Sequence, residues 1–240
     1  MKILVGCPTY KGYAYCIQEY LSRVRSLTFP SFDLALVDNS EDDSYAAFLR
    51  SQGIMVLRGP HLSSIPERIT ISRNILREYA LAHGYDYLFS LEQDVIPPPD
   101  VLERLLAHNQ KIVTGVYFKL YPLTLTQTGK KDGKVVKRIK ALAPVLFAFS
   151  TSPGKMEIFT AKTLDPPRLL KVRASGLGCM LIHRSVLEQI SFRFDPSVDT
   201  YDDVLFCNDL LDKGFSLYAD TGIRCKHLIL HREKKSSSQP

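Results

Sequence analysis

The first half of the chain alternates short apolar runs with segments of helical period. Four runs have the length of buried strands, at residues 2–7, 34–37, 54–57 and 85–91. Three segments between them are typical of helices, at residues 13–26, 44–52 and 66–84. The last of these has Ser63 or Ser64 as a cap and Pro66 as its first residue. The alternation predicts βαβ units and a mostly parallel, Rossmann-like sheet flanked by helices.

The second half has a different pattern, which predicts a small antiparallel section. A strand is expected at 112–118, and the segment 119–140 that follows is basic and contains two glycines, as in a mobile loop or a hairpin. Residues 141–150 and 156–160 are expected to pair. A strand at 179–183 and a helix from Asp202 to a glycine cap at Gly214 complete the pattern.

Composition narrows the class of protein. The 240 residues are 45% apolar, with a formal net charge of +6, so a sizeable core is expected together with a basic surface. The five cysteines are scattered and form no C-x-x-C, which argues against a disulfide scaffold or zinc site and favours a reducing compartment. No run approaches the length of a signal-peptide core or a membrane span. We expect a soluble, cytoplasmic protein.

The acidic triplet Glu92-Gln93-Asp94 is the first candidate site. It follows the apolar run 85–91, and three prolines from Pro97 end any continuation of the strand. The two carboxylates therefore lie at the carboxyl edge of the sheet, where open α/β folds bind ligands. Spaced i and i+2, they suit a hard cation that also holds phosphate oxygens. The alternative is a simple turn or cap.

Two further segments fit a nucleotide site. Asp38-Asn39-Ser40 ends the second strand, where an acid can accept hydrogen bonds from a ribose or base; an Asx turn is the alternative. Arg73 lies in the third helix and could pair with phosphate, although a solvated helix face is the ordinary interpretation.

The last candidates lie in the second half of the chain. Asp202 and Asp203 open the final helix, where carboxylates cap free N–H groups, but adjacent like charges also raise one pKa and suit a general base. His227, taken alone, is most simply an ordinary surface or core histidine. It becomes a candidate metal ligand only if it lies beside Asp94. The pair Gly176-x-Gly178 would let a ligand approach the backbone closely, but two glycines at this spacing are only a weak indication of a binding site.

The order of these segments resembles the family 2 glycosyltransferases of GT-A fold. The resemblance covers about residues 2–228, and its motifs become specific only through their shared order. They are Pro8-Thr9-Tyr10, Asp38-Asn39-Ser40, Ser72-Arg73-Asn74, Glu92-Gln93-Asp94, the segment Asp202 to Cys207, and Leu217 to Asp220 with His227.

The resemblance implies a role for each segment. It implies a single domain at 1–230, with a nucleotide-binding half at about 1–118 and an acceptor-binding half at 119–230. The polar composition of the last residues separately predicts a disordered tail at 231–240. Asp94 would bind Mn²⁺ or Mg²⁺ with Glu92 and His227, and Asp203, with Asp202 beside it, would be the general base of an inverting transfer. The nucleotide would contact Pro8, Thr9, Tyr10, Asp38, Asn39, Arg73 and Gln93, and the sugar or acceptor would contact Gly176, Leu177 and Gly178.

The implied partners are a nucleoside-diphosphate sugar, with UDP or GDP favoured, and a hydroxyl on a carbohydrate, a lipid phosphate or another acceptor. No nucleic acid is expected, and segment 119–140 is a candidate for peripheral membrane contact. Two departures stand out: Glu92 replaces the first acid of the family's Asp-x-Asp motif, and Asp202 replaces the glutamate of its Glu-Asp pair.

Three alternatives stay open at this stage. A retaining transferase of the same fold has the same sequence pattern. A nucleotidyltransferase is disfavoured, because the loop from Gly6 to Gly12 has one lysine and no dense glycine run. A binding module without catalysis would use the basic segment 119–140, which has only Phe118 and Tyr121 nearby for stacking on bases.

Overall fold

The structure is a computed structural model that describes residues 1–128, 134–151, 156–198 and 200–228, with side chains inside 122–139 excepted. The tail predicted at 231–240 lies outside these ranges. Within the described part of the chain, no helix has the length and apolar character needed to cross a membrane.

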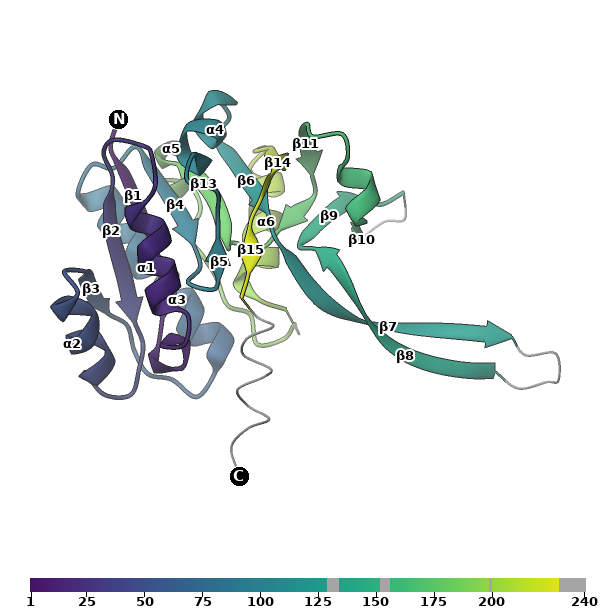
Figure 1. Ribbon diagram of the computed structural model, residues 1–240, viewed down its shortest axis with the longest axis horizontal. Coiled ribbons are helices and arrows are strands. Elements are labelled where there is room, and N and C mark those ends of the chain that lie inside the picture. Colours follow the sequence, from purple (N-terminus) through teal and green to yellow (C-terminus); the bar gives the residue numbers. More distant parts are fainter. Residues whose placement is uncertain (129–133, 152–155, 199, 229–240) are drawn as a thin grey trace.

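An eight-stranded mixed sheet forms the centre of the fold (Figure 1). Its strand order is β11-β14-β6-β13-β4-β1-β2-β3. Strands β3, β2, β1 and β4 are parallel neighbours, as are β14 and β6, whereas β13 and β11 run antiparallel to theirs. The mostly parallel sheet expected from the sequence is confirmed. The strand bounds are β1 Ile3–Thr9, β2 Asp33–Asp38, β3 Met55–Arg58, β4 Tyr87–Leu91, β6 Ile112–Val116, β11 Leu169–Val172, β13 Cys179–His183 and β14 Leu217–Arg224.

Helices cover both faces of this sheet. Alternate residues of β1 point to opposite sides, so Ile3 and Val5 join one core with α1, α2 and α4, and Leu4 joins the other with α3, α5 and α6. Helix α1 lies in front of the sheet in Figure 1. The helix bounds are α1 Ile17–Arg25, α2 Ser44–Ser51, α3 Ile65–Ala82, α4 Val101–Ala107, α5 Arg184–Leu187 and α6 Asp202–Asp212, with 3-10 turns η1 Lys11–Tyr13 and η2 Ala161–Leu164.

The ends of the long helices follow their predicted signals. The Ser64 hydroxyl accepts from the Glu67 N–H and caps α3, with Pro66 in its first turn. Gly84 follows α3 and Gly214 follows α6, with φ of 71° and 74°, a backbone conformation that side chains with a Cβ disfavour. The predicted caps at these positions are confirmed.

Three small antiparallel sheets complete the structure. The segment predicted as a loop or hairpin is a long hairpin of β7 (Phe118–Thr128) and β8 (Lys134–Pro144). The expected pairing of 141–150 with 156–160 is confirmed in part: β9 (Leu146–Phe149) pairs with β10 (Met156–Ile158), with β12 (Ala174–Ser175) on the other side, whereas residues 141–144 belong to β8 and pair with β7. The third sheet pairs β5 (Val95–Ile96) with β15 (Lys226–His227).

The two halves of the chain share the central sheet. Strand β6 from the first half lies between β13 and β14 from the second. As a result, the carboxyl ends of β1, β2 and β4 lie at one edge of the central sheet. The start of α6 and the end of the described chain lie at the same edge.

Candidate functional site

A cavity of about 400 Å³ lies at this edge. It is lined by residues from both halves of the chain, which brings together most of the predicted site. The predicted residues that line it are Pro8, Tyr10, Asn39, Arg73, Glu92, Gln93, Asp94, Asp202, Asp203 and His227, and the further lining residues are Tyr13, Ile65, Arg68, Ile69, Tyr117, Lys119, Val145 and Tyr201.

The acidic triplet forms a turn fixed to its neighbours. Strand β4 ends at Leu91, and the Glu92 N–H donates to the Gly178 carbonyl at 3.0 Å. Thr9, at the end of β1, donates its hydroxyl proton to Gln93 Oε1 at 2.5 Å, and both side chains are about 1% exposed. Thr9 and Gln93 therefore hold the turn against the sheet, with Thr9 beneath the cavity wall.

Arg73 is buried between two carboxylates of the site. It is 5% exposed, so the interpretation of a solvated helix face is wrong. Its Nη2 lies 2.5 Å from Glu92 Oε1, and its Nε lies 2.7 Å from Asp202 Oδ2. Burial alone would lower the pKa of Arg73, but the charges of Asp202 and Glu92 raise it above its usual value. The guanidinium is thus already neutralised by protein carboxylates.

Asp94 and His227 form a second pair in the cavity wall. Strands β5 and β15 pair Val95 with His227, and the Leu228 N–H donates to the Asp94 carbonyl at 2.7 Å. His227 Nε2 lies 3.5 Å from Asp94 Oδ2, and its Nδ1 bonds the Phe118 carbonyl at 2.7 Å. Burial opposes the charged imidazole, yet the hydrogen bond and charge of Asp94 raise the pKa of His227.

Asp94 also has an unused ligand atom. Its Oδ1 is buried and has no hydrogen-bond partner among the described residues, although the side chain is 6% exposed. In the described ranges, no group of three His, Cys, Asp or Glu side chains could hold a metal ion. The unpartnered Asp94 Oδ1 is a donor of the kind that Mg²⁺ uses, since such a cation binds one or two carboxylates and takes its other ligands from water and substrate phosphates.

The adjacent acids at the start of α6 differ in their surroundings. Asp202 is 4% exposed and paired with Arg73, whereas Asp203 is half-buried and lacks an ion pair in the described structure. The Val204 N–H donates to Asp203 Oδ1 at 2.7 Å. Burial, then the charge of Asp202, raises the pKa of Asp203 to about 6. Burial also raises the pKa of Asp202, but its charge is held by the ion pair with Arg73, so Asp203 is the acid of the two that is free to exchange a proton near neutral pH.

No family model and no curated protein matches the chain. Among solved structures, GalNAc-T7 with UDP, GalNAc and Mn²⁺ superposes with a TM-score of 0.60 at 13% identity, over 95% of this chain and 43% of that one. The mannosyltransferase PcManGT from Pyrobaculum calidifontis with GDP-Man and Mn²⁺ superposes with a TM-score of 0.53 at 14% identity, over 93% of this chain and 55% of that one. TarS from S. aureus with UDP-GlcNAc superposes with a TM-score of 0.51 at 16% identity, over 92% of this chain and 56% of that one.

The fold is of the GT-A type. The three neighbours are glycosyltransferases of this fold, and this chain spans about half of their length. At these identities the likeness concerns the fold, and membership of family 2 stays a prediction.

In this GT-A structure the predicted Asp38 lies behind the cavity rather than in its wall. Asp38 is fully buried, forms an ion pair with Arg58, and accepts from the Ser40 N–H and hydroxyl at 3.1 and 2.6 Å. This is the Asx turn named as the alternative. Asn39 lines the cavity instead: its Nδ2 donates to Ser72 Oγ at 3.1 Å, and its Oδ1 has no partner among the described residues.

Arg68 is a cavity residue that the sequence reasoning missed. It is 9% exposed, its guanidinium lies 5.4 Å from the ring centroid of Tyr10, and its Nη1 lies 3.2 Å from His61 Nδ1. No carboxylate pairs with it in the described structure, and its Nε is unpartnered there. Its position in the first turn of α3 was a usable signal, because that turn starts at the ligand-binding edge, whereas Arg73 lies about 7 Å further along the axis.

The predicted glycine loop lies outside the cavity wall. A Cβ on Gly176 would stand 2.0 Å from the Tyr117 hydroxyl, and one on Gly178 would stand 2.8 Å from the same ring. Leu177 is 1% exposed. Gly176 and Gly178 therefore back the Tyr117 ring, which itself lines the cavity, whereas Leu177 packs in the other core. The predicted contact of the two glycines with sugar or acceptor would act through that ring.

Proposed function

We propose that this chain is a glycosyltransferase that moves a sugar from a nucleoside diphosphate to an acceptor hydroxyl. The observation that carries the proposal is that Asp94, His227, Arg68 and Asp203 line one cavity of a GT-A fold. The first three supply groups for a diphosphate and its cation. The fourth supplies a proton acceptor with a pKa of about 6.

The donor nucleotide occupies the part of the cavity formed by β1, β2 and α3. Arg68 pairs with the diphosphate, because it is the buried cavity guanidinium without a carboxylate partner in the described structure. Asn39 presents an unpartnered Oδ1 to the ribose or base, and Pro8 and Tyr10 form the wall beside it. Arg73 and Asp38 support this site from behind rather than touching the nucleotide.

Asp94 and His227 would hold a divalent cation, Mn²⁺ or Mg²⁺, beside the diphosphate of the donor. The neighbours GalNAc-T7 and PcManGT were solved with Mn²⁺, which supports this choice. When bound, such an ion neutralises the charge that develops on the departing diphosphate. Glu92 contributes through its ion pair with Arg73, which fixes the turn that carries Asp94.

Asp203 is the general base. It takes the proton of the acceptor hydroxyl, whose oxygen forms a bond to the anomeric carbon as the bond to the diphosphate oxygen breaks. Attack from the face opposite the diphosphate inverts the anomeric centre. Asp202 does not compete for this role, because its carboxylate is buried against Arg73.

A binding screen with a product analysis tests the proposal. Thermal unfolding is measured with UDP-, GDP- and dTDP-sugars, each with and without Mn²⁺, and at least one donor should raise Tm in a Mn²⁺-dependent way. Products formed with that donor are then analysed for anomeric configuration, which should be inverted. Stabilisation by oligonucleotides but by no nucleotide sugar would instead favour a non-catalytic nucleic-acid module.

A further inference from the structure

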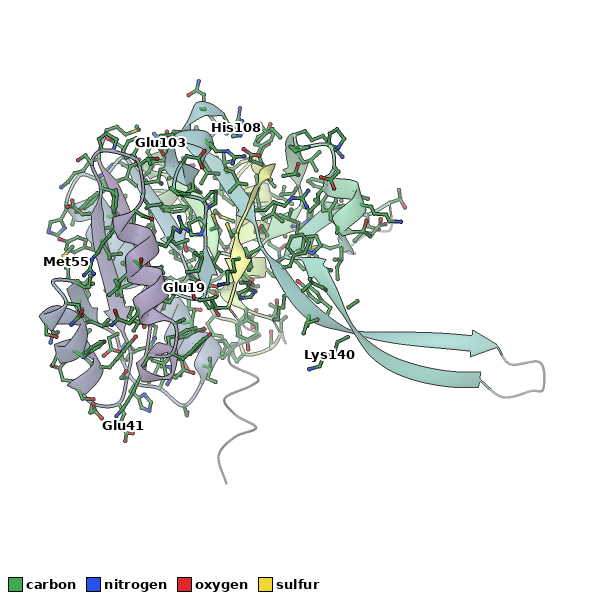
Figure 2. All side chains as sticks on the ribbon, in the orientation of Figure 1. Glu19, Glu41, Met55, Glu103, His108 and Lys140 are labelled. Carbon is green, nitrogen blue, oxygen red and sulfur yellow. The ribbon has the colours of Figure 1, made fainter. Side chains whose placement is uncertain are left out.

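Apart from its root, where Lys119 lines the cavity and the Phe118 carbonyl bonds His227, the hairpin of β7 and β8 takes no part in the proposed chemistry. The two strands pair continuously from Phe118 opposite Pro144 to Thr128 opposite Lys134. They form a sheet of their own and run away from the body of the molecule (Figure 1). Lys140 lies near the root of the hairpin, where it leaves the body (Figure 2), and is exposed.

These two strands carry most of the net charge of the protein. The whole chain has 31 basic and 25 acidic residues. Strands β7 and β8 contain no acidic residue and five of the basic ones, which are Lys119, Lys134, Lys137, Arg138 and Lys140. The remainder therefore has 26 basic against 25 acidic residues, and is close to neutral. The positive charge of the protein is therefore concentrated on the hairpin, whereas the basic and acidic residues of the remainder nearly cancel.

The same strands are also rich in apolar residues. Of their 22 residues, 11 are apolar, although β7 and β8 pair only with each other in the described sheets. At the root, where side chains are described, Leu142 is 58% exposed. An isolated two-stranded ribbon buries little apolar surface on its own. A sequence that combines cations and apolar residues on such a ribbon is typical of segments that lie in the headgroup region of a membrane.

We propose that the β7–β8 hairpin docks this protein on membranes that contain anionic lipid. The four cations that do not line the cavity, Lys134, Lys137, Arg138 and Lys140, meet the lipid phosphates, and apolar residues of the strands enter the boundary between headgroups and acyl chains. A nucleic-acid partner fits less well, because Phe118 and Tyr121 are the only aromatic residues of the two strands, fewer than a base-stacking platform uses. This docking is independent of the proposed transfer reaction.

Vesicle sedimentation tests the proposal directly. The full chain is mixed with vesicles of phosphatidylcholine alone, or with 30% phosphatidylglycerol added, and the bound fraction is measured without any nucleotide. We expect binding to the anionic vesicles only, weakening steeply with added salt. Each basic residue near such a surface contributes roughly a fivefold factor to partitioning. The triple variant Lys137→Glu, Arg138→Glu, Lys140→Glu should therefore bind at least about 100-fold more weakly.

A matched control variant distinguishes binding by the hairpin from an effect of the total net charge of the protein. The variant Arg25→Glu, Lys171→Glu, Lys213→Glu removes the same charge from exposed positions on α1, on β11 and after α6. It should bind anionic vesicles far better than the hairpin variant, and both should show the wild-type Tm. Equal losses in the two variants would overturn the proposal. It would also be overturned by equal binding to neutral vesicles, or by tighter binding to a single-stranded oligonucleotide than to anionic vesicles at the same salt.

Discussion

Arg73 joins the two ends of the site: its guanidinium lies 2.5 Å from Glu92 Oε1 and 2.7 Å from Asp202 Oδ2. Glu92 belongs to the turn after β4, and Asp202 to the first turn of α6, 110 positions further along the chain. One buried cation therefore positions both the turn that carries Asp94 and the helix that carries Asp203. It also explains why adjacent aspartates at the start of α6 have different surroundings, since only Asp202 is paired with Arg73.

Replacing Arg73 with Met should destabilise the fold strongly. The buried carboxylate of Asp202 and the partly buried one of Glu92 would lose their partner, and breaking a buried pair costs about 3–5 kcal/mol. Urea denaturation at pH 7.5 measures this loss, which should shrink in acid as Glu92 and Asp202 become protonated. Unchanged stability with weakened nucleotide binding would instead show that Arg73 is a phosphate ligand, as the sequence pattern alone indicated.

Replacing Arg68 with Gln should weaken nucleotide binding and leave the fold intact. A charge-assisted hydrogen bond is worth about 1.5–3 kcal/mol, so affinity for a nucleoside diphosphate should fall roughly 10- to 100-fold. Calorimetry should show little change for the nucleoside without phosphates. Arg25→Gln, on the exposed side of α1, is the control and should bind as the wild type does. Equal loss for nucleoside and diphosphate would contradict a phosphate contact.

Asp203 should make both activity and stability depend on pH. Because burial raises its pKa to about 6, kcat/KM should rise with pH through about 6 and then level off, as expected of a base that must be ionised. The folded state binds this proton more tightly than the unfolded state, so its contribution to stability is present at low pH and lost as pH rises through 6. Asp203→Asn should therefore be more stable than the wild type at pH 8, by a margin that narrows from pH 6 to pH 4. A pH-independent difference in urea denaturation would contradict this assignment.

Asp94→Ala should abolish the Mn²⁺-dependent part of nucleotide binding. The substitution removes the orphaned Oδ1 and the partner of His227, so calorimetry with nucleoside diphosphate should give the same Kd with and without Mn²⁺. Asp212→Ala removes an exposed carboxylate at the end of α6 and should keep the metal effect. A metal effect that survives in Asp94→Ala would place the ion elsewhere.

Gly176→Ala should destabilise the protein through the Tyr117 hydroxyl, which would lie 2.0 Å from the new Cβ. Overpacking of this kind costs about 1–3 kcal/mol. The double variant with Tyr117→Phe removes the clashing oxygen and should recover much of the loss in thermal unfolding. An additive double variant would show that the two residues do not meet.

The fold was largely predictable from the sequence because local signals agreed with it. Apolar runs at 2–7, 34–37 and 85–91 became β1, β2 and β4, and the serine cap and terminal glycine set the bounds of α3. Short elements such as β5 and β15 were not predicted, since two residues carry no periodicity and their pairing joins positions 95 and 227.

The position of several candidate residues at one edge of the sheet was predictable, whereas their contacts were not. The motif order brought Asp94, Asp203 and His227 to one cavity, because parallel strands end at the same edge. Whether a charged side chain faces a ligand or another side chain depends on distant partners. Arg73 and Asp38 are neutralised by Glu92, Asp202 and Arg58, and no local pattern reveals such pairs.

Comparison of wild type and Asp203→Asn with the donor found in the binding screen tests the central claim most directly. Calorimetry gives Kd for the nucleotide sugar, and release of nucleoside diphosphate in the presence of an acceptor gives the rate of transfer. We expect equal Kd values, with release by the wild type and a loss of at least about 100-fold in the variant. Transfer by Asp203→Asn at the wild-type rate would contradict the account.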